Sequence, residues 1–201
     1  MRFIYFMSNL IFCPHTDDAI FSLGDYIFDN NSFTIASAFS GVPTDIIGYK
    51  KHTLLRKEHQ EACELIGAKI INNDLLDDVY GKQDEQLLFA WIKSTINNFN
   101  NIYIPLGIHH PDHIFLSDKL FEIMDLYNKK YFIYAELPYR ILYPELYQER
   151  IDKFKSKGKL EEVTIKFTKN KINAVEKYKS QIDNNLIEKL IVEEKLWRLL
   201  N

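Results

Sequence analysis

Two short segments of this 201-residue chain gather residue types that hold metal ions. The first, Pro14-His15-Thr16-Asp17-Asp18, carries one imidazole and two carboxylates. The second, His109-His110-Pro111-Asp112-His113, carries three imidazoles and one carboxylate within five residues. Imidazole and carboxylate groups without a thiolate suit a borderline divalent ion such as Zn²⁺. Together the two segments predict a zinc site.

The number of these groups also suits catalysis. Catalytic zinc takes three protein ligands and leaves its fourth position to water. His15 and Asp18 can converge on one cation, and a histidine of the second segment completes the three. Asp17 then lies beside the ion without having to bind it, and a free carboxylate there can act as a general base. The residues therefore predict metal-assisted hydrolysis.

Both segments directly follow short apolar runs that read as buried strands, Asn9–Cys13 and Asn101–Pro105. In α/β sheets the ligand site lies outside the carboxyl ends of the strands. We therefore expect the two loops to meet at one edge of a sheet.

The rest of the chain alternates further apolar runs with amphipathic segments. We expect strands at residues 32–39, 69–71 and 131–135, and helices at residues 19–28, 50–66, 85–99 and 117–127. Parallel strands need crossover connections, which are usually helical. The pattern predicts an α/β, Rossmann-like three-layer fold with a mainly parallel sheet and helices on both faces.

The chain length suits a single domain spanning residues 1–201. Pro138, Pro144 and the polar residues 145–159 mark a change of character after the last expected strand. Residues 171–181 and 184–200 both have apolar residues at helical spacing. We therefore expect residues from about 145 to 201 to form a C-terminal helical appendage of the same domain.

At the two motifs the sequence resembles the LmbE-like family, also called the PIG-L de-N-acetylase family, which comprises zinc-dependent N-acetylglucosaminyl deacetylases. The family motifs are approximately Pro/Ala-His-Pro-Asp-Asp and His-x-Asp-His, here residues 14–18 and 110–113. The likeness extends to residues 17–24, 105–107, 134–139 and 178–181. Thr16 replaces the usual proline of the first motif, which removes no ligand, and Asp25 stands where a second glycine often follows.

The resemblance implies a role for each motif residue. His15, Asp18 and His113 would be the ligands of one zinc ion, or of another divalent transition metal, and Asp17 the general base. A protonated His110 would stabilise the oxyanion, with Asp112 holding its ring. Candidate substrate contacts are Arg56, near a position where relatives often carry an arginine, His109 beside the second motif, and Glu136 after a strand.

The expected function is a zinc-dependent hydrolase, a deacetylase that removes an N-acetyl group from an amino sugar or sugar conjugate. Two alternatives keep the metal: an amidase acting on a non-sugar amide or thiol conjugate, and a non-catalytic metal- or carbohydrate-binding module. A Mg²⁺-dependent phosphoryl transferase is disfavoured, because Mg²⁺ prefers oxygen ligands and the chain has no glycine-rich phosphate loop.

Composition points to a small-molecule partner. The formal net charge of −3 gives no electrostatic reason to expect binding to nucleic acid. Cys13 and Cys63 are the only cysteines, too few for a disulfide framework, and no apolar stretch is long enough for a membrane span. We therefore expect a cytoplasmic enzyme.

Overall fold

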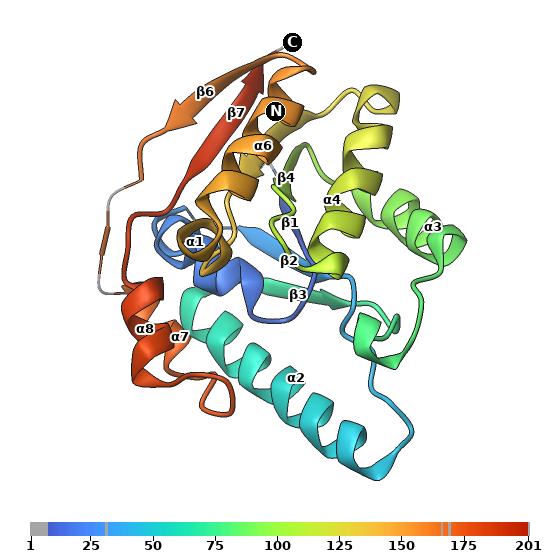
Figure 1. The fold of residues 1–201 in the computed structure, drawn as a ribbon, viewed down its shortest axis with the longest axis vertical. Helices are drawn as coiled ribbons and strands as arrows, with labels where there is room; N and C mark the ends of the chain where they lie inside the picture. Colours follow the sequence, from blue (N-terminus) through green and yellow to red (C-terminus); the bar gives the residue numbers. More distant parts are fainter. Residues whose placement is uncertain (1–7, 31, 166, 169, 201) are drawn as a thin grey trace, which may run out of the picture.

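The computed structural model describes residues 8–30, 32–165, 167–168 and 170–200, and within them the chain forms one seven-stranded sheet (Figure 1). The strands are β1 (Asn9–Cys13), β2 (Phe33–Ser37), β3 (Lys69–Asn72), β4 (Asn101–Pro105), β5 (Lys130–Tyr134), β6 (Lys159–Val163) and β7 (Leu196–Leu200). Their order is β3-β2-β1-β4-β5-β7-β6. The first five strands pair in parallel, and β7 joins β5 and β6 by antiparallel pairing.

The strand order places the ends of β1 and β4 side by side. From β1 the chain builds outward through β2 and β3, then returns to add β4 on the other side of β1. Such a reversal opens a crevice at the carboxyl ends of the two central strands. Both sequence motifs begin directly after these two strands, so the topology alone brings them together.

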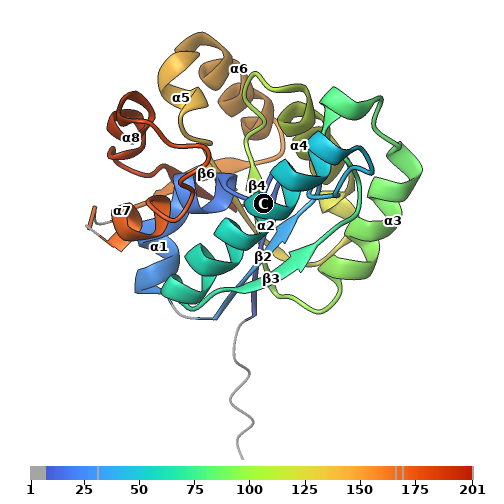
Figure 2. The same ribbon diagram turned by 90° about the horizontal axis from the view of Figure 1, so that it is seen from below.

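Helices cover both faces of the sheet. They are α1 (Asp18–Asp29), α2 (Ile46–Ile66), α3 (Glu85–Ile96), α4 (Pro111–Ile123), α5 (Tyr139–Leu142), α6 (Pro144–Lys155), α7 (Asn170–Val175) and α8 (Asn184–Leu190), with short 3₁₀ turns at Asp78–Tyr80 and Met124–Leu126. Figure 2 shows α1 and α7 on the side of the sheet opposite α3.

The side chains of β1 alternate between two apolar cores, one on each face. Leu10 and Phe12 pack with residues of α3, α4 and α6, whereas Ile11 and Cys13 pack with residues of α1, α2 and α7. This alternation is the period-two pattern of a strand buried on both faces. The predicted mixed α/β architecture with a mainly parallel sheet is confirmed.

Two helices begin earlier than their apolar pattern indicated, since capping residues set their starts. α2 begins at Ile46, where the Asp45 side chain accepts a hydrogen bond from the Gly48 backbone N–H at 2.8 Å, and it ends at Gly67 with φ of 71°. α4 begins at Pro111, inside the second motif, with His110 as its N-cap. The second motif is therefore partly helical.

The predicted C-terminal helical appendage is only partly correct, since it contains two strands and the helix expected over residues 171–181 ends at Val175. The helix expected over residues 184–200 ends at Leu190, and Leu196–Leu200 instead forms β7 against β5. β6, which we had not expected, then pairs with β7 as an edge strand. None of the helices in the part of the chain that the structure describes has the length and low polarity needed to cross a bilayer.

Candidate metal centre

The two motif loops meet as expected, and His15, Asp18 and His113 form a compact group. His15 follows β1, Asp18 opens α1, and His113 lies in the first turn of α4. Asp18 Oδ2 lies 3.5 Å from His15 Nδ1 and 3.4 Å from His113 Nε2. One ligand atom of each residue lies within 4.8 Å of the others.

These separations fit a zinc ion. Two atoms that bind tetrahedral zinc at about 2.0–2.1 Å lie about 3.4 Å apart. His113 Nε2 is buried and finds no hydrogen-bond partner among the residues that the structure describes. A buried polar nitrogen without a partner is rare. A metal ion would give this atom the partner that the protein does not.

The second nitrogen of each histidine contacts a carboxylate. His15 Nε2 lies 3.0 Å from Asp112 Oδ2, and His113 Nδ1 lies 3.2 Å from Glu136 Oε1. Histidine ligands of metals usually donate their other N–H to such a group, which fixes the tautomer and the ring orientation. The donor set, its spacing and its supporting carboxylates therefore all suit zinc.

Glu136 is placed differently from the substrate contact that the sequence suggested. Its side chain is fully buried behind His113 and is not part of the cleft lining. Oε1 accepts hydrogen bonds from the backbone N–H groups of Gly107 at 2.8 Å and Ile108 at 3.3 Å. Glu136 therefore orients His113 and ties the second loop to the end of β5.

The group opens into a cleft lined by residues of several elements. The lining comprises His15, Thr16, Asp17 and Asp18 of the first motif, Phe39 and Ser40 after β2, Lys51, His52, Leu55 and Arg56 of α2, and Asp77, His110, Tyr139 and Gln181. The cleft thus joins the candidate metal ligands to one wall formed by α2.

Asp17 lies in this lining and is not used as a cap. It is the N-cap residue of α1, yet its side chain makes no capping hydrogen bond. Burial, together with the neighbouring Asp18 carboxylate, raises the pKa of Asp17 to about 6. A carboxylate with a pKa near neutrality beside a metal site is suited to proton transfer.

Burial and neighbouring charged groups also shift the pKa values of His15, His110 and Asp18. Burial alone would lower the pKa of His15, but hydrogen bonds to Asp112 and Asp18 raise it well above its usual value. Burial, and then the nearby His15 and His113, lower the pKa of His110. Asp18 is buried, yet His113 and His15 hold its pKa below the ordinary value.

The contacts of Asp112 differ from the predicted link to the His110 ring. Its fully buried carboxylate contacts His15 Nε2 and accepts hydrogen bonds from Gln83 Nε2 at 2.7 Å and the Asp78 backbone N–H at 3.1 Å. His110 Nδ1 instead accepts a 3.3 Å hydrogen bond from the Asp112 backbone N–H. The Asp112 side chain therefore orients His15, a candidate metal ligand, and its backbone orients His110.

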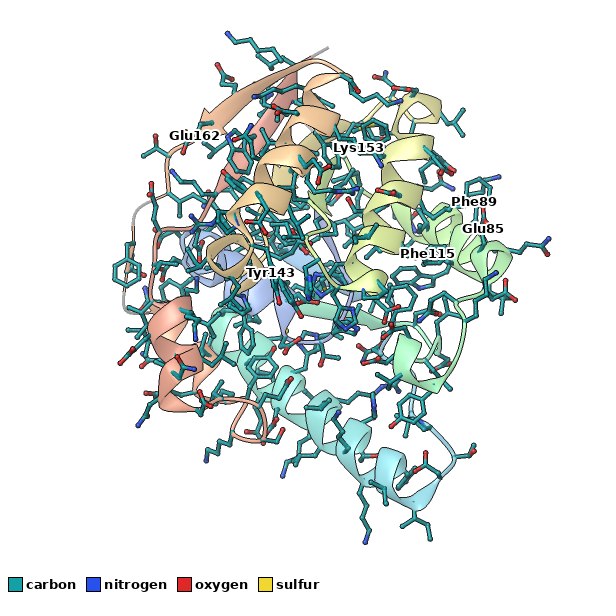
Figure 3. All side chains as sticks on the ribbon, viewed as in Figure 1. Glu85, Phe89, Phe115, Tyr143, Lys153 and Glu162 are labelled. Carbon is teal, nitrogen blue, oxygen red and sulfur yellow. The ribbon has the colours of Figure 1, made fainter. Side chains whose placement is uncertain are left out.

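Of the other two predicted substrate contacts, Arg56 lies in the cleft lining and His109 lies outside it. Arg56 lines the cleft, but its guanidinium donates from Nε to the Ser40 carbonyl at 2.6 Å and from Nη2 to the Asn73 carbonyl and Asp74. His109 is exposed and stacks on Tyr143, labelled in Figure 3, with ring centroids 3.7 Å apart. His109 is not in the cleft lining.

Sequence reasoning missed several cleft residues. Asp77 Oδ2 lies 3.7 Å from His15 Nε2, and the Tyr139 ring centroid lies 4.8 Å from that of His113. An Asp-Asp pair that follows the third expected strand was a usable signal for Asp77. Gln181 lies within residues 178–181, where the sequence resembles the family, although that likeness assigned it no role. His52 carries no such signal, since only the packing of α2 brings it to the cleft.

Comparisons with known proteins support the fold. No protein-family model and no curated protein sequence matches the chain. Among solved structures, the A40926 pseudoaglycone deacetylase Dbv21 superposes with a TM-score of 0.75 at 17% identity, covering 96% of each chain. The zinc-inhibited form of the teicoplanin deacetylase Orf2 gives 0.71 at 20% identity, covering 96% of this chain and 98% of that one.

An N,N'-diacetylchitobiose deacetylase from Pyrococcus horikoshii gives a TM-score of 0.59 at 19% identity, covering 91% of this chain and 73% of that one. All three similar structures are deacetylases, in agreement with the resemblance that the two motifs carry. At these identities the likeness establishes that the chain shares their fold.

Proposed function

We propose that this protein is a zinc-dependent hydrolase that removes an N-acetyl group from an amino sugar or sugar conjugate. The observation that carries the proposal is the group formed by His15, Asp18 and His113 at ligand spacing, with the uncapped Asp17 beside it in an open cleft. The three structural neighbours lend support, since each is a deacetylase and one acts on diacetylchitobiose.

His15 Nδ1, Asp18 Oδ2 and His113 Nε2 would hold the ion, with Asp112 and Glu136 behind the two histidines. Zinc with three protein ligands supplies Lewis-acid chemistry: it polarises a carbonyl group and lowers the pKa of a water molecule. Among the residues described, this donor set is the best matched to zinc. The group His15, His110 and Asp112 uses a carboxylate whose oxygens already accept hydrogen bonds from Gln83 and the Asp78 backbone, and the group Asp77, Asp78 and Asp112 has carboxylates alone.

Asp17 is the group that moves protons. As a general base it takes a proton from the attacking water, and it then returns that proton to the amine nitrogen as the amide C–N bond breaks. The products are acetate and a free amine. A pKa of about 6 suits both directions of transfer near neutral pH.

His110 lines the cleft and is placed to serve the oxyanion. Because Nδ1 accepts the Asp112 backbone N–H, the proton of a neutral ring lies on Nε2. Burial lowers its pKa and so favours that neutral form over the protonated ring expected from the resemblance. His110 can therefore donate a hydrogen bond to the developing negative charge on the carbonyl oxygen, where fixed donors contribute strongly to catalysis.

We also propose that residues 1–201 act as one Rossmann-like domain in the cytoplasm. The strand order around β1 and β4 supports this assignment, and β6 and β7 extend the same sheet, which ties the C-terminal segment to the rest. Cys13 and Cys63 are both free and buried, which agrees with a reducing compartment.

A substrate screen tests the proposal. The zinc-loaded protein is incubated with N-acetylated amino sugars as free saccharides, glycosides, sugar phosphates and nucleotide sugars, and mass spectrometry detects loss of the acetyl group. Non-sugar amides and thiol conjugates form a second panel. We expect deacetylation within the sugar panel. Turnover confined to the second panel would favour the amidase alternative, and no turnover in either would contradict a hydrolytic role.

A further inference from the structure

The wall of the cleft formed by α2 differs in charge from the metal end. Asp17, Asp18 and Asp77 lie at or beside the metal ligands, whereas α2 contributes Lys51, His52 and Arg56 to the lining. The cleft therefore carries negative charge at the candidate metal site and positive charge along α2. Its cationic wall has no role in the proposed hydrolysis.

Two buried nitrogen atoms of this cleft have no hydrogen-bond partner within the described ranges. They are His52 Nε2, whose residue is only 6% exposed, and Gln181 Nε2, from the segment between α7 and α8. Buried side-chain polar atoms are almost always paired with protein or ordered water. Both unpaired nitrogens belong to residues that line the same cleft, so both are available to hydrogen-bond a ligand there.

The charge of the α2 wall is also largely uncompensated. Lys51 is exposed and forms no ion pair with any acidic residue in the described part of the chain. Arg56 has one ion pair, at 3.1 Å, with Asp74, a side chain 96% exposed to solvent. Two positive charges thus border a cleft in which the donors of His52 and Gln181 are free.

We propose that Lys51, His52 and Gln181 of this wall bind an anionic group of the substrate, next to the Arg56 guanidinium, whose Nε and Nη2 are already bonded within the protein. The substrate class is then an N-acyl amino sugar that carries a carboxylate or a phosphate, with its amide at the metal and its anion against α2. The inference rests on the proposed function, which it narrows. Lys51 supplies charge, while His52 and Gln181 supply hydrogen bonds; charge-assisted hydrogen bonds are the stronger kind.

Binding to an inactive variant tests the inference apart from turnover. Zinc-loaded Asp17→Asn protein is titrated calorimetrically with three probes: N-acetylglucosamine 1-phosphate, N-acetylmuramic acid and the neutral methyl glycoside of N-acetylglucosamine. We expect at least one of the two anionic probes to bind about fivefold tighter than the neutral one, as a partly screened charge pair gives. The phosphate and carboxylate arms identify which anion the wall prefers.

The matched variants locate the preference. Lys51→Gln in the same background should reduce the ratio of anionic to neutral affinity to near one. Lys50→Gln removes the same charge from the adjacent residue of α2, which is exposed and outside the cleft lining, and should leave the ratio unchanged. A preference that survives Lys51→Gln would place the anion away from Lys51, and one that both variants reduce equally would reflect overall charge. Either result overturns the inference.

Hydrolysis by the wild-type protein, measured on the same probes, separates the two proposals. Tighter anion binding that depends on Lys51, without hydrolysis of any probe, supports the binding wall and contradicts the proposed function. Hydrolysis with equal affinity for charged and neutral probes supports the proposed function and contradicts the wall. Failure of all three probes to bind counts against the inference as stated.

Discussion

Replacing Glu136 by glutamine removes one buried negative charge while keeping the shape of the side chain. Oε1 accepts the backbone N–H groups of Gly107 and Ile108 and lies 3.2 Å from His113 Nδ1. A glutamine oxygen at the same place can retain all three contacts. What is lost is the charge that makes His113 a better ligand.

The magnitude follows from two separate effects. Loss of a carboxylate behind a histidine ligand typically weakens metal binding by about 10- to 100-fold, or about 1.4 to 2.7 kcal/mol. The second oxygen of Glu136, Oε2, is buried and has no partner among the described residues. The amide nitrogen of Glu136→Gln would occupy that place, and a buried unpaired donor costs about 1–3 kcal/mol of folding stability.

Two measurements separate these effects. Zinc affinity is obtained by competition with a chromophoric chelator, and the stability of the metal-free protein by urea unfolding. Asp118→Asn is the matched control, since Asp118 is a carboxylate of α4 that pairs with Arg150 and Lys153 rather than with a metal ligand. Zinc affinity within twofold of the wild type for Glu136→Gln, or an equal loss for Asp118→Asn, would refute the role given to Glu136.

Three further predictions concern the same framework. Zinc affinity should rise by up to about tenfold per pH unit below the raised pKa of His15, because that ring must lose its proton before it binds the ion. Chelator competition from pH 6 to 8 measures this dependence, and a constant affinity would contradict it. Tyr178→Phe removes the hydroxyl that donates to the Thr16 carbonyl at 2.9 Å and lies 3.0 Å from His59 Nδ1. The change should cost about 1–3 kcal/mol of folding stability and weaken zinc binding, and unchanged unfolding with unchanged zinc affinity would contradict it. Lys171→Met leaves the buried Glu194 without the cation that lies 3.4 Å away, which should destabilise the protein by about 3–5 kcal/mol at pH 8. The cost should be smaller at pH 5.5, because burial raises the pKa of Glu194 to about 7 and the carboxyl group is then protonated. Urea unfolding at the two pH values measures the difference, and an equal cost at both would contradict the prediction.

The sign of the last prediction follows from proton binding. A carboxyl group with a raised pKa in the folded state holds its proton to higher pH than it does when the chain is unfolded. Its contribution to stability is therefore present at low pH and decreases as pH rises through about 7. Removing the cation of Lys171 raises the pKa of Glu194 further and extends that decrease to higher pH.

The sequence was most informative where a physical requirement leaves a local pattern. β1 and β4 are buried on both faces and so appear as continuous apolar runs, and both were predicted with their observed bounds. The candidate metal ligands could be proposed from the sequence because His15, Asp18 and His113 lie in two compact motifs directly after those strands. Their grouping in space confirms the expected meeting of the two loops.

Prediction failed where tertiary pairing decides the outcome. β6 has the sequence Lys-Leu-Glu-Glu-Val, and its polar character is typical of an edge strand rather than of the expected buried strands. The apolar residues of β7 fit a helical spacing as well as a strand, and only pairing with the free edge of β5 selects the strand. His52 reaches the cleft through the packing of α2 against distant segments, which no local pattern reveals.

The most direct test of the central claim is acetate release measured together with zinc content in one preparation of wild-type and Asp17→Asn protein, on a substrate found in the screen. We predict one zinc ion per chain in both proteins and acetate release at least about 100-fold slower in the variant, the lower range for loss of a general base. Comparable acetate release by the two proteins, or a wild-type protein equally active without zinc, would contradict the account.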